Sequence, residues 1–377
     1  NTFGTIDDIG YSVGIDGLSG TSDDVYAKAR YTNNTGLTID QSQTYGSHAS
    51  VNALLREYDA TGRPTGRVVS GNTAFLTDGI PGNDALAKGV ATWADVKLNA
   101  LRVGIVLSDG NVHNAPVLKV DPAGKLLFTP DGTLWTTAAY VGPALDSDPF
   151  ERNPDGTVKL TGQDFLLDFN PGISLDQHII TGDGRGNENI GLTAVHNVFH
   201  EEHNFQVENI KTSIETEAAA ILVADGAIAA AAFIAQWQTA PNMWDGEKLF
   251  QAARLITETE YNHIAIDQYV GTLYGALPEF VSYSADINMG VTLEFSQSVF
   301  RLGHSMLTET FDVIDPATGQ PLKLLDAFLD PTKYQAIGAE ALTLGLTLTL
   351  GNEVDEFVTP ALQQSLLGQP LDLATIN

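Results

Sequence analysis

The chain contains no cysteine and few basic residues. Without cysteine it can form no disulfide, and it offers no thiolate for catalysis or for binding a metal ion. Only 19 Lys and Arg residues stand against 47 Asp and Glu residues, so the formal net charge is −28. A protein this acidic repels nucleic-acid phosphates and anionic lipids. We therefore expect neither nucleic acid nor a membrane surface among its partners.

Long hydrophobic runs are also scarce in the 377 residues. The most apolar stretch, residues 218–237, is long enough to cross a bilayer, but it is rich in alanine and contains Asp225 and Gln236. It is better interpreted as a buried helix, and no membrane span is expected. Hydrophobic residues still make up 43% of the chain, which suffices for a large core and excludes wholesale disorder.

The two halves of the chain differ in pattern. Gly, Asn, Asp, Thr and Ser crowd residues 1–50, and turn signals continue as far as residue 156, which predicts loops with short strands. The second half carries apolar residues at helical spacing. Helices are expected over residues 192–237, 249–273, 291–308, 341–350 and 359–367. The sequence therefore predicts a mainly α fold with long wrapping loops and few short strands.

Three histidines, His196, His200 and His203, are spaced so that a helix would place them within about 60° of one face. Such a stripe could bind zinc, for which His is a common ligand. However, the segment from His200 to His203 lacks the spacing of the H-E-x-x-H zinc motif, and one helix rarely supplies three ligands to one ion. A partly buried polar stripe is the favoured interpretation. A zinc site and a role in orienting nearby groups remain as alternatives.

A glycine-rich segment with two charged residues precedes the first long helix. Arg185 and Glu188 lie among the glycines of residues 183–189, and glycine allows a loop to approach a ligand closely. The same segment could be an ordinary first turn with a local ion pair, worth about 0–1 kcal/mol. Spacing alone favours the ordinary turn.

His304 follows Gly303 in an apolar segment that is expected to be helical. Glycine inside a helix costs about 1 kcal/mol relative to alanine, which makes sense if a large flat group lies against the backbone. Haem fits that description, with His304 as the axial ligand. The alternative is a hydrogen-bonded core histidine, which spacing alone favours.

Oxygen-bearing side chains alternate along the segment that holds Thr38, Asp40 and Ser42. In an extended chain these three side chains share one side. Calcium prefers several such oxygens together with backbone carbonyls. A calcium site and a polar strand edge are equally compatible with this pattern.

Taken together, five segments resemble, in the same order, motifs of the animal-type haem peroxidases, the peroxidase–cyclooxygenase superfamily, in its bacterial secreted branch. They are residues 38–47 (TIDQSQTYGS), similar to the calcium loop; 182–204, similar to the catalytic Arg–Glu loop and the helix after it; 249–275, similar to the next long helix; 295–304 (FSQSVFRLGH), similar to the helix of the proximal histidine; and 371–377 (LDLATIN), similar to the segment behind that histidine. Five ordered motifs outweigh the interpretation of each motif taken alone.

The resemblance implies roles for four residues around a haem b. His304 would be the proximal iron ligand, and Asn377 would hydrogen-bond the other nitrogen of its ring. Arg185 would be the distal arginine, which stabilises the charge that builds on the leaving oxygen of peroxide. Glu188 matches the glutamate that can form an ester to a haem methyl in this family.

The resemblance also implies a bound calcium ion. Asp40 and Ser42 match side-chain ligands of the family's calcium loop, and Thr38 matches a carbonyl donor. Gly36 stands where the family has a threonine ligand, so it can offer only its carbonyl oxygen.

This chain departs from the family pattern at both ends. Only 39 residues precede Asp40, and the first histidine is His48, so the family's distal histidine has no counterpart in this piece. We expect residues 1–377 to be a single incomplete haem peroxidase domain, truncated at both ends and inactive on its own. Residues 1–182 would form the loop-rich wrapping region with the calcium loop, and residues 183–377 the helical haem-binding core. The missing flanking segments could be separate chains.

The function implied by the resemblance is that of a peroxidase, an oxidoreductase in a secreted, extracellular bacterial protein. It would use hydrogen peroxide to oxidise a small reducing substrate such as a phenol, a halide or Mn(II). One alternative is a catalytically inactive, peroxidase-like module of a large secreted or adhesin protein. A zinc hydrolase built on the three spaced histidines is another.

Overall fold

The computed structural model describes residues 5–7, 11–12, 25–26, 30–32, 41–46, 49–71, 89–107, 109, 170, 172–276, 279, 281–282, 284, 286, 290–292, 295 and 299–364. The chain divides by its contacts into two compact units. The larger unit comprises residues 40–277 and 310–349. The smaller unit comprises residues 1–39, 278–309 and 350–377. Each unit is described by itself.

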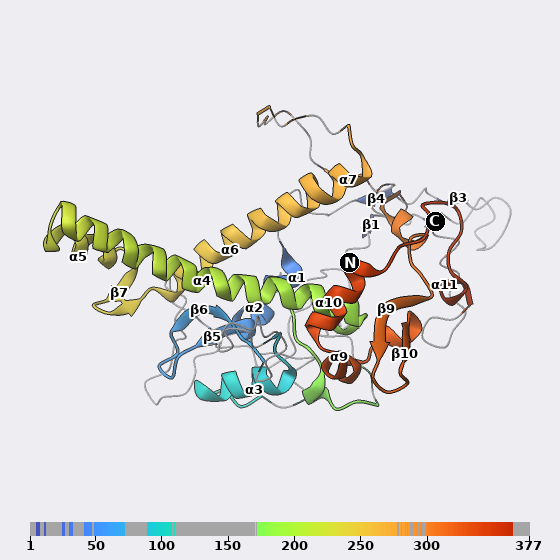
Figure 1. Cartoon of the computed structure of the whole chain (residues 1–377), viewed down its shortest axis with the longest axis horizontal. Helices are drawn as coiled ribbons and strands as arrows, with labels where there is room; N and C mark the ends of the chain where they lie inside the picture. The colour runs from blue at the N-terminus through green and yellow to red at the C-terminus, as the bar shows by residue number, and fades with distance from the viewer. Residues whose placement is uncertain are drawn as a thin grey trace. The chain divides into compact units, whose positions relative to one another are not determined.

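The longest element is helix α4 (Ile190–Ala224), which crosses the larger unit (Figure 1). The helix begins after Asn189, whose side-chain oxygen accepts a hydrogen bond from a backbone N–H of the first turn and so caps the helix. It ends at a turn where Gly226 adopts a φ of 89°, and α5 (Ala227–Ala235) follows and packs against α4. The helix expected over residues 192–237 is therefore two helices joined by a glycine turn.

Helix α6 (Gly246–His263) packs against α4 and continues into a π-helical segment, η4 (Ile264–Val270), and then α7 (Gly271–Leu273). The helix predicted over residues 249–273 is thus confirmed, although its hydrogen-bonding pattern changes in the second half. The apolar cluster that joins α6 to α4 and α5 consists of Val207, Ile210, Ile214, Phe233, Ile234, Trp237, Trp244, Leu249 and Ala253.

A small layer of helices and strands packs beside α4 (Figure 1). Its elements are α2 (Ala49–Leu55), the antiparallel pair β5 (Arg56–Tyr58) and β6 (Pro64–Val68), and α3 (Trp93–Arg102). A capping box in which Thr92 and Asp95 exchange hydrogen bonds starts α3. The core of this layer is built around Trp93, which is fully buried.

The remaining elements of the larger unit are short. They are α1 (Ser42–Tyr45), η2 (Leu175–Gln177), η3 (Gly184–Asn187), β7 (Gln238–Ala240), β8 (Met243–Trp244), β9 (Thr310–Asp315), β10 (Gln320–Lys323), η6 (Leu325–Ala327), α9 (Pro331–Ile337) and α10 (Ala339–Leu348). Helix α10, predicted over residues 341–350, packs against both α4 and β9. Gly345 permits the approach to β9, because a β-carbon there would collide with Val313.

The smaller unit contains two antiparallel strand pairs, a 3₁₀ turn and a short helix. The elements are β1 (Thr5–Asp7) with β4 (Arg30–Thr32), β2 (Tyr11–Ser12) with β3 (Val25–Tyr26), η5 (Val299–His304) and α11 (Pro360–Gln364). Helix α11 corresponds to the helix predicted over residues 359–367. Every sheet among the described residues is a two-stranded antiparallel ribbon.

The helix predicted over residues 291–308 is confirmed only at residue 295 and, as a 3₁₀ turn, over residues 299–304. Only η5 and residue 295 are helical there, and residues 290–292 and 307–308 are not. Val299 and Leu302 remain well exposed, so the packing that stabilises an amphipathic helix is weak at these positions. Gly303 further disfavours an α-helical turn.

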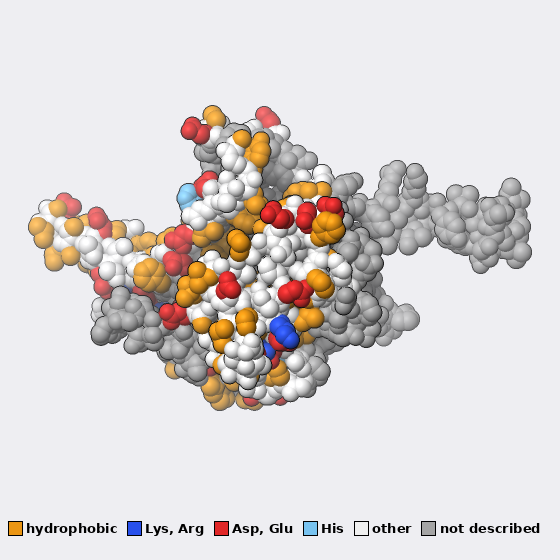
Figure 2. Space-filling view, turned by 45° about the vertical axis from the view of Figure 1, so that its right-hand side comes forward, with side chains coloured by type: hydrophobic (Ala, Val, Ile, Leu, Met, Phe, Trp, Pro, Cys, Tyr) orange, Lys and Arg blue, Asp and Glu red, His pale blue; other side chains and the backbone are white. Residues whose placement is uncertain are grey.

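The apolar stretch 218–237 is not a buried helix, in contrast to the sequence interpretation. Val223 and Ile228, at the turn between α4 and α5, are 89% and 90% exposed. Within the described ranges, no helix combines the length and hydrophobicity needed to cross a membrane. Acidic side chains dominate the charged surface visible in Figure 2, in keeping with the net charge.

The described residues are mainly helical with few short strands, which confirms the predicted fold class. The prediction of one domain divided at residue 182 stays a prediction. The hairpin that turn signals suggest near Pro130 lies outside the described residues.

Candidate functional site

The Arg185 loop immediately precedes α4 and is held to its surroundings by buried hydrogen bonds. The Asn187 side chain accepts a hydrogen bond from the Ile179 N–H at 2.8 Å and donates one to the Ile179 carbonyl at 2.7 Å. The Thr193 hydroxyl on α4 donates to the Gly186 carbonyl at 2.6 Å. Because Asn187 and Thr193 are both buried, these bonds are shielded from water and fix the loop on the end of the helix.

Asp183 binds Arg185 by both its carboxylate oxygens. One oxygen accepts hydrogen bonds from the Arg185 backbone N–H at 2.9 Å and from Nε at 3.0 Å, and the other accepts from Nη2 at 2.6 Å. Burial raises the pKa of Asp183, but the hydrogen bonds and the positive charge of Arg185 outweigh it and hold that pKa below its usual value. The Arg185 side chain is 47% exposed, so its guanidinium lies at the surface of the unit with its plane oriented by Asp183.

Both backbone polar groups of Glu188, its N–H and its carbonyl, form hydrogen bonds. Its N–H donates to the Arg185 carbonyl at 2.8 Å, and its own carbonyl accepts from the Leu329 N–H at 3.1 Å. The next residue, Asn189, forms a bridge with Phe328. Arg185 and Glu188 are therefore carried by one rigid turn, and the Glu188 side chain is half-buried.

The same loop lies directly on α1, the helix that begins at Ser42. The Gly182 N–H donates to the Gln43 carbonyl at 2.9 Å. A β-carbon on Gly182 would collide with the Ser42 carbonyl oxygen and with the Gly46 nitrogen, so only glycine fits at this contact. Of the four predicted calcium ligands, Ser42 is described and half-buried, and Gly36, Thr38 and Asp40 lie outside the described residues.

The three spaced histidines lie inside the protein along α4. His203 is satisfied, because its Nε2 donates to the Gly66 carbonyl at 3.0 Å and its Nδ1 accepts from the Tyr45 hydroxyl at 3.0 Å. In contrast, Nε2 of His196 and both ring nitrogens of His200 are buried without a hydrogen-bond partner among the described residues. Burial lowers the pKa of His196 and His203 to about 4 and that of His200 to about 3, so all three are neutral at pH 7.

This arrangement does not support the zinc interpretation. No group of three or more His, Asp or Glu side chains suited to a metal ion occurs among the described residues. His203 has both nitrogens engaged in hydrogen bonds, so it is not available as a third ligand. The favoured polar stripe describes His203 well, but His196 and His200 carry unpartnered nitrogens.

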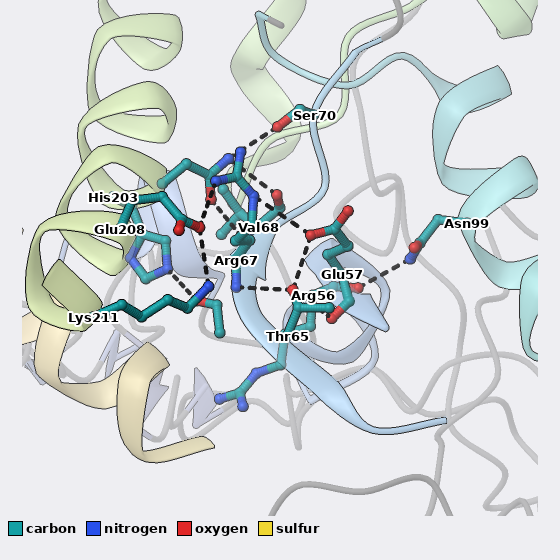
Figure 3. A network of polar contacts seen from close by, with 12 residues as sticks. Arg56, Glu57, Thr65, Arg67, Val68, Ser70, Asn99, His203, Glu208 and Lys211 are labelled. Atoms are coloured by element: carbon teal, nitrogen blue, oxygen red, sulfur yellow. Dashed lines mark hydrogen bonds and ion pairs between the residues drawn. The ribbon is translucent and has the colours of Figure 1, made fainter. Parts of the chain in front are cut away.

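Polar side chains of α4 also hold strand β6, as Figure 3 shows around Arg67 and Val68. The Asn204 side-chain amide accepts a hydrogen bond from the Val68 N–H at 2.9 Å and donates one to the Val68 carbonyl at 3.2 Å. It thus pairs with both backbone groups of Val68, as the backbone of a neighbouring strand would. Arg67 pairs with Glu57 at 3.5 Å and with Glu208 at 3.2 Å. These contacts fix the small helix–strand layer on α4.

His304 is the last residue of η5 in the smaller unit and is half-buried. A β-carbon on the neighbouring Gly303 would meet no atom of the described residues within 4 Å, so the backbone there is open toward them on that side. Asn377, the residue expected behind His304, lies outside the described residues. Arg185 and Glu188 belong to the larger unit, and His304 belongs to the smaller one.

Sequence reasoning missed Asp183, Asn187 and Asn204 as residues that shape this region. Their contacts join residues that are close only after folding, apart from the bond between Asp183 and Arg185. The available signal was chemical. A buried Asn or Asp beside a functional motif must satisfy its polar atoms, and backbone groups of the motif are the nearest partners.

Comparison with known proteins assigns the chain to a family. The model of the family described as animal haem peroxidase matches residues 153–377, more than half of the chain. Peroxinectin A of Dictyostelium discoideum is 26% identical over an alignment of 283 residues, which covers 67% of this chain and 48% of that protein. Peroxidasin of Drosophila melanogaster is 27% identical over an alignment of 218 residues, which covers 52% of this chain and 12% of that protein.

The chain thus spans about half of peroxinectin A and a smaller part of peroxidasin. A solved structure, that of peroxidase A from Dictyostelium discoideum, matches with a TM-score of 0.48 at 20% identity, over 89% of this chain and 45% of that one. The matched family segment includes Arg185, Glu188 and His304. The chain belongs to the animal haem peroxidase family.

Proposed function

We propose that this chain is the haem-binding core of a peroxidase that uses hydrogen peroxide to oxidise a small donor. The observation that carries the proposal is the Arg185 loop. Its guanidinium is at the surface of the larger unit, oriented by Asp183 on a turn that buried hydrogen bonds hold to α4. A fixed positive group of this kind stabilises developing negative charge without having to reorganise during the reaction.

The residues present fit haem. His304 supplies an imidazole, a common axial ligand of haem iron, beside a glycine whose backbone is open to a flat group. Glu188 is half-buried on the same turn as Arg185, and it would be the residue that forms an ester to a haem methyl. Bound haem would supply the redox-active iron for the reduction of peroxide. Asn377 would hydrogen-bond the second ring nitrogen of His304.

Arg185 would act on the peroxide itself. The guanidinium stays protonated at every physiological pH, so it can donate hydrogen bonds to a peroxide oxygen and stabilise the charge that develops there. Fixing it in advance removes the entropy cost of orienting a long side chain during the reaction.

We further propose a calcium ion held by Asp40 and Ser42 side chains, with carbonyl oxygens of Thr38 and Gly36. The contact of Gly182 with α1 supports this, because it joins the end of the calcium loop to the Arg185 loop. Chelation with EGTA should therefore lower the melting temperature and weaken haem retention. An unchanged melting temperature and haem spectrum would remove calcium from the proposal.

The donor would be a phenol, a halide or Mn(II), and the acidic surface favours a cation such as Mn(II). The location would be extracellular, in a bacterial secreted protein, and the flanking segments could be separate chains. A second candidate function is a non-catalytic module of a large secreted or adhesin protein. It draws support from peroxidasin, of which the match covers only 12%.

Spectroscopy of the haem-loaded whole protein, with its flanking segments, tests the main proposal. The wild type should show a Soret band and peroxide-dependent oxidation of a phenolic dye. His304→Ala should lose both, whereas the matched control His263→Ala, at an exposed position on α6, should keep both. A wild type with a Soret band but no peroxide reaction would favour the non-catalytic module. Retention of the haem spectrum by His304→Ala would remove that residue as the iron ligand.

A further inference from the structure

Asp183 is in direct contact with Arg185, and it is not among the residues that the proposed function assigns to haem, peroxide or calcium. Its two carboxylate oxygens engage two of the three guanidinium nitrogens and also the backbone N–H of Arg185. A contact with Nε and Nη2 at once defines the plane of the guanidinium, which a single hydrogen bond would not do. The electrostatic influence of Asp183 also reaches His196 on α4.

The backbone that carries Asp183 is itself rigid. The Thr181 hydroxyl donates to the Asp183 carbonyl at 2.7 Å, and Thr181 is only 1% exposed. The Gly186 N–H donates to the same carbonyl at 3.1 Å. The residue before Asp183, Gly182, packs so closely against α1 that no side chain would fit there. The carboxylate therefore projects from a fixed point, to which the longer Arg185 side chain is bound.

We propose that Asp183 is a positioning residue, which holds the Arg185 guanidinium in the orientation needed to bind peroxide. The inference rests on the proposed function. An arginine side chain that is 47% exposed has many rotamers open to it, and each productive encounter with peroxide requires it to be ordered. The carboxylate confines it before peroxide arrives.

A purely structural role for Asp183 makes a different prediction. Its acceptance of the Arg185 backbone N–H starts the turn η3, as a capping residue would. Asparagine keeps a carbonyl oxygen for that backbone bond, but it loses the charge and presents an NH₂ group where the guanidinium needs an acceptor. Asp183→Asn therefore separates the positioning role from the capping role.

The experiment compares the haem-loaded full-length protein with its Asp183→Asn variant. In that variant we expect the Soret band and haem retention to be unchanged. The kcat/KM for hydrogen peroxide should fall about tenfold, as loss of a transition-state contact predicts, while the rate constant for the donor stays the same. Cyanide affinity of the ferric protein, measured without turnover, should fall as well, because cyanide would meet the same guanidinium.

Further variants complete the test. Asp176→Asn removes another carboxylate that pairs with a basic side chain, that of Lys97, and it should leave every readout unchanged. Asp183→Glu keeps the charge and should recover part of the lost peroxide rate. If Asp183→Asn does not bind haem, Asp183→Ser decides, because serine keeps an acceptor for the Arg185 backbone N–H and loses the charge. A peroxide rate and cyanide affinity of that variant within twofold of Asp176→Asn would overturn the inference.

The two proposals fail in different ways. A wild type that binds haem and reacts with peroxide, together with an Asp183→Asn variant within twofold of it, would overturn the positioning role alone. A wild type without haem binding or peroxide reaction would overturn the proposed function, and the positioning role with it.

Discussion

The two halves of α4 are built differently, although they form one continuous helix. In residues 190–207, polar and apolar side chains alike are buried, and they bind the Arg185 loop, strand β6 and α1. Beyond Val207, only Ile214 and Ala218 are buried. The first half is located by specific hydrogen bonds, whereas the second depends on helix propensity, the ion pair of Glu208 with Arg67 and one apolar cluster with α5 and α6. Buried polar contacts thus mark the half that carries the candidate site.

Lowering the pH should destabilise the protein chiefly through the buried histidines in the first half of α4. Burial lowers the pKa of His196, His200 and His203 to between about 3 and about 4, against 6.5 for an exposed histidine. Below pH 6.5 the unfolded chain binds protons that the folded chain does not, so the free energy of unfolding falls as the pH drops toward 4. A tenfold loss of proton affinity at one histidine corresponds to about 1.4 kcal/mol, so three such histidines make this the largest effect.

Urea unfolding at pH 7 and pH 5 measures that effect. His200→Leu should show a smaller loss of stability between the two pH values than the wild type does. Equal losses in both proteins would contradict the assignment of the acid sensitivity to the buried stripe.

Asn204→Ala should cost about 2–3 kcal/mol of the free energy of unfolding, because it leaves the buried backbone groups of Val68 without partners. Its control is Asn209→Ala in the second half of the same helix, which should change stability by less than about 0.5 kcal/mol. Urea denaturation of both variants tests the comparison. Similar costs at the two positions would mean that the halves do not differ as described.

His200→Leu should stabilise the protein at pH 7 by about 1–2 kcal/mol, since both ring nitrogens of His200 are buried without partners. His203→Leu should destabilise it, because that change removes the bonds to Tyr45 and Gly66. The two melting temperatures should therefore move in opposite directions. A fall in both would show that His200 makes a favourable contact.

The smallest effect is expected at the turn that ends α4. Val223→Glu and Ile228→Glu replace side chains that are about nine-tenths exposed, so the free energy of unfolding should change by less than about 0.5 kcal/mol. Thermal melting of both variants checks this. A drop of several degrees would indicate that these side chains are covered in solution.

The helical half of the fold could be predicted from periodicity, because apolar spacing is a local property. It located the first residues of α4, α6 and α10 to within a few positions. It did not predict the turn at Gly226, where alanine and other apolar residues continue on both sides, or the π-helical segment η4, which has no sequence signature here. Over residues 291–308 the described chain forms a 3₁₀ turn where an α-helix was expected, because periodicity cannot report whether a partner surface is present.

The spacing of residues along the sequence predicted much less of the candidate site than of the helices. Arg185 and Glu188 were singled out as a loop near a ligand, but spacing favoured an ordinary turn, and only the resemblance to a family assigned them roles. A local ion pair does exist, but it joins Arg185 to Asp183, a residue that the sequence interpretation did not single out. What spacing could not supply was the set of long-range bonds from Asn187, Thr193 and Leu329 that make the turn rigid.

The turn at Gly226 has a practical consequence. A β-carbon there would meet nothing within 4 Å, and the flanking side chains face water. Exposed turns of this kind tolerate insertions far better than packed elements do. A dye-labelling cysteine placed between α4 and α5 would be the sole thiol among these 377 residues, so the protein could be immobilised or labelled at one defined point.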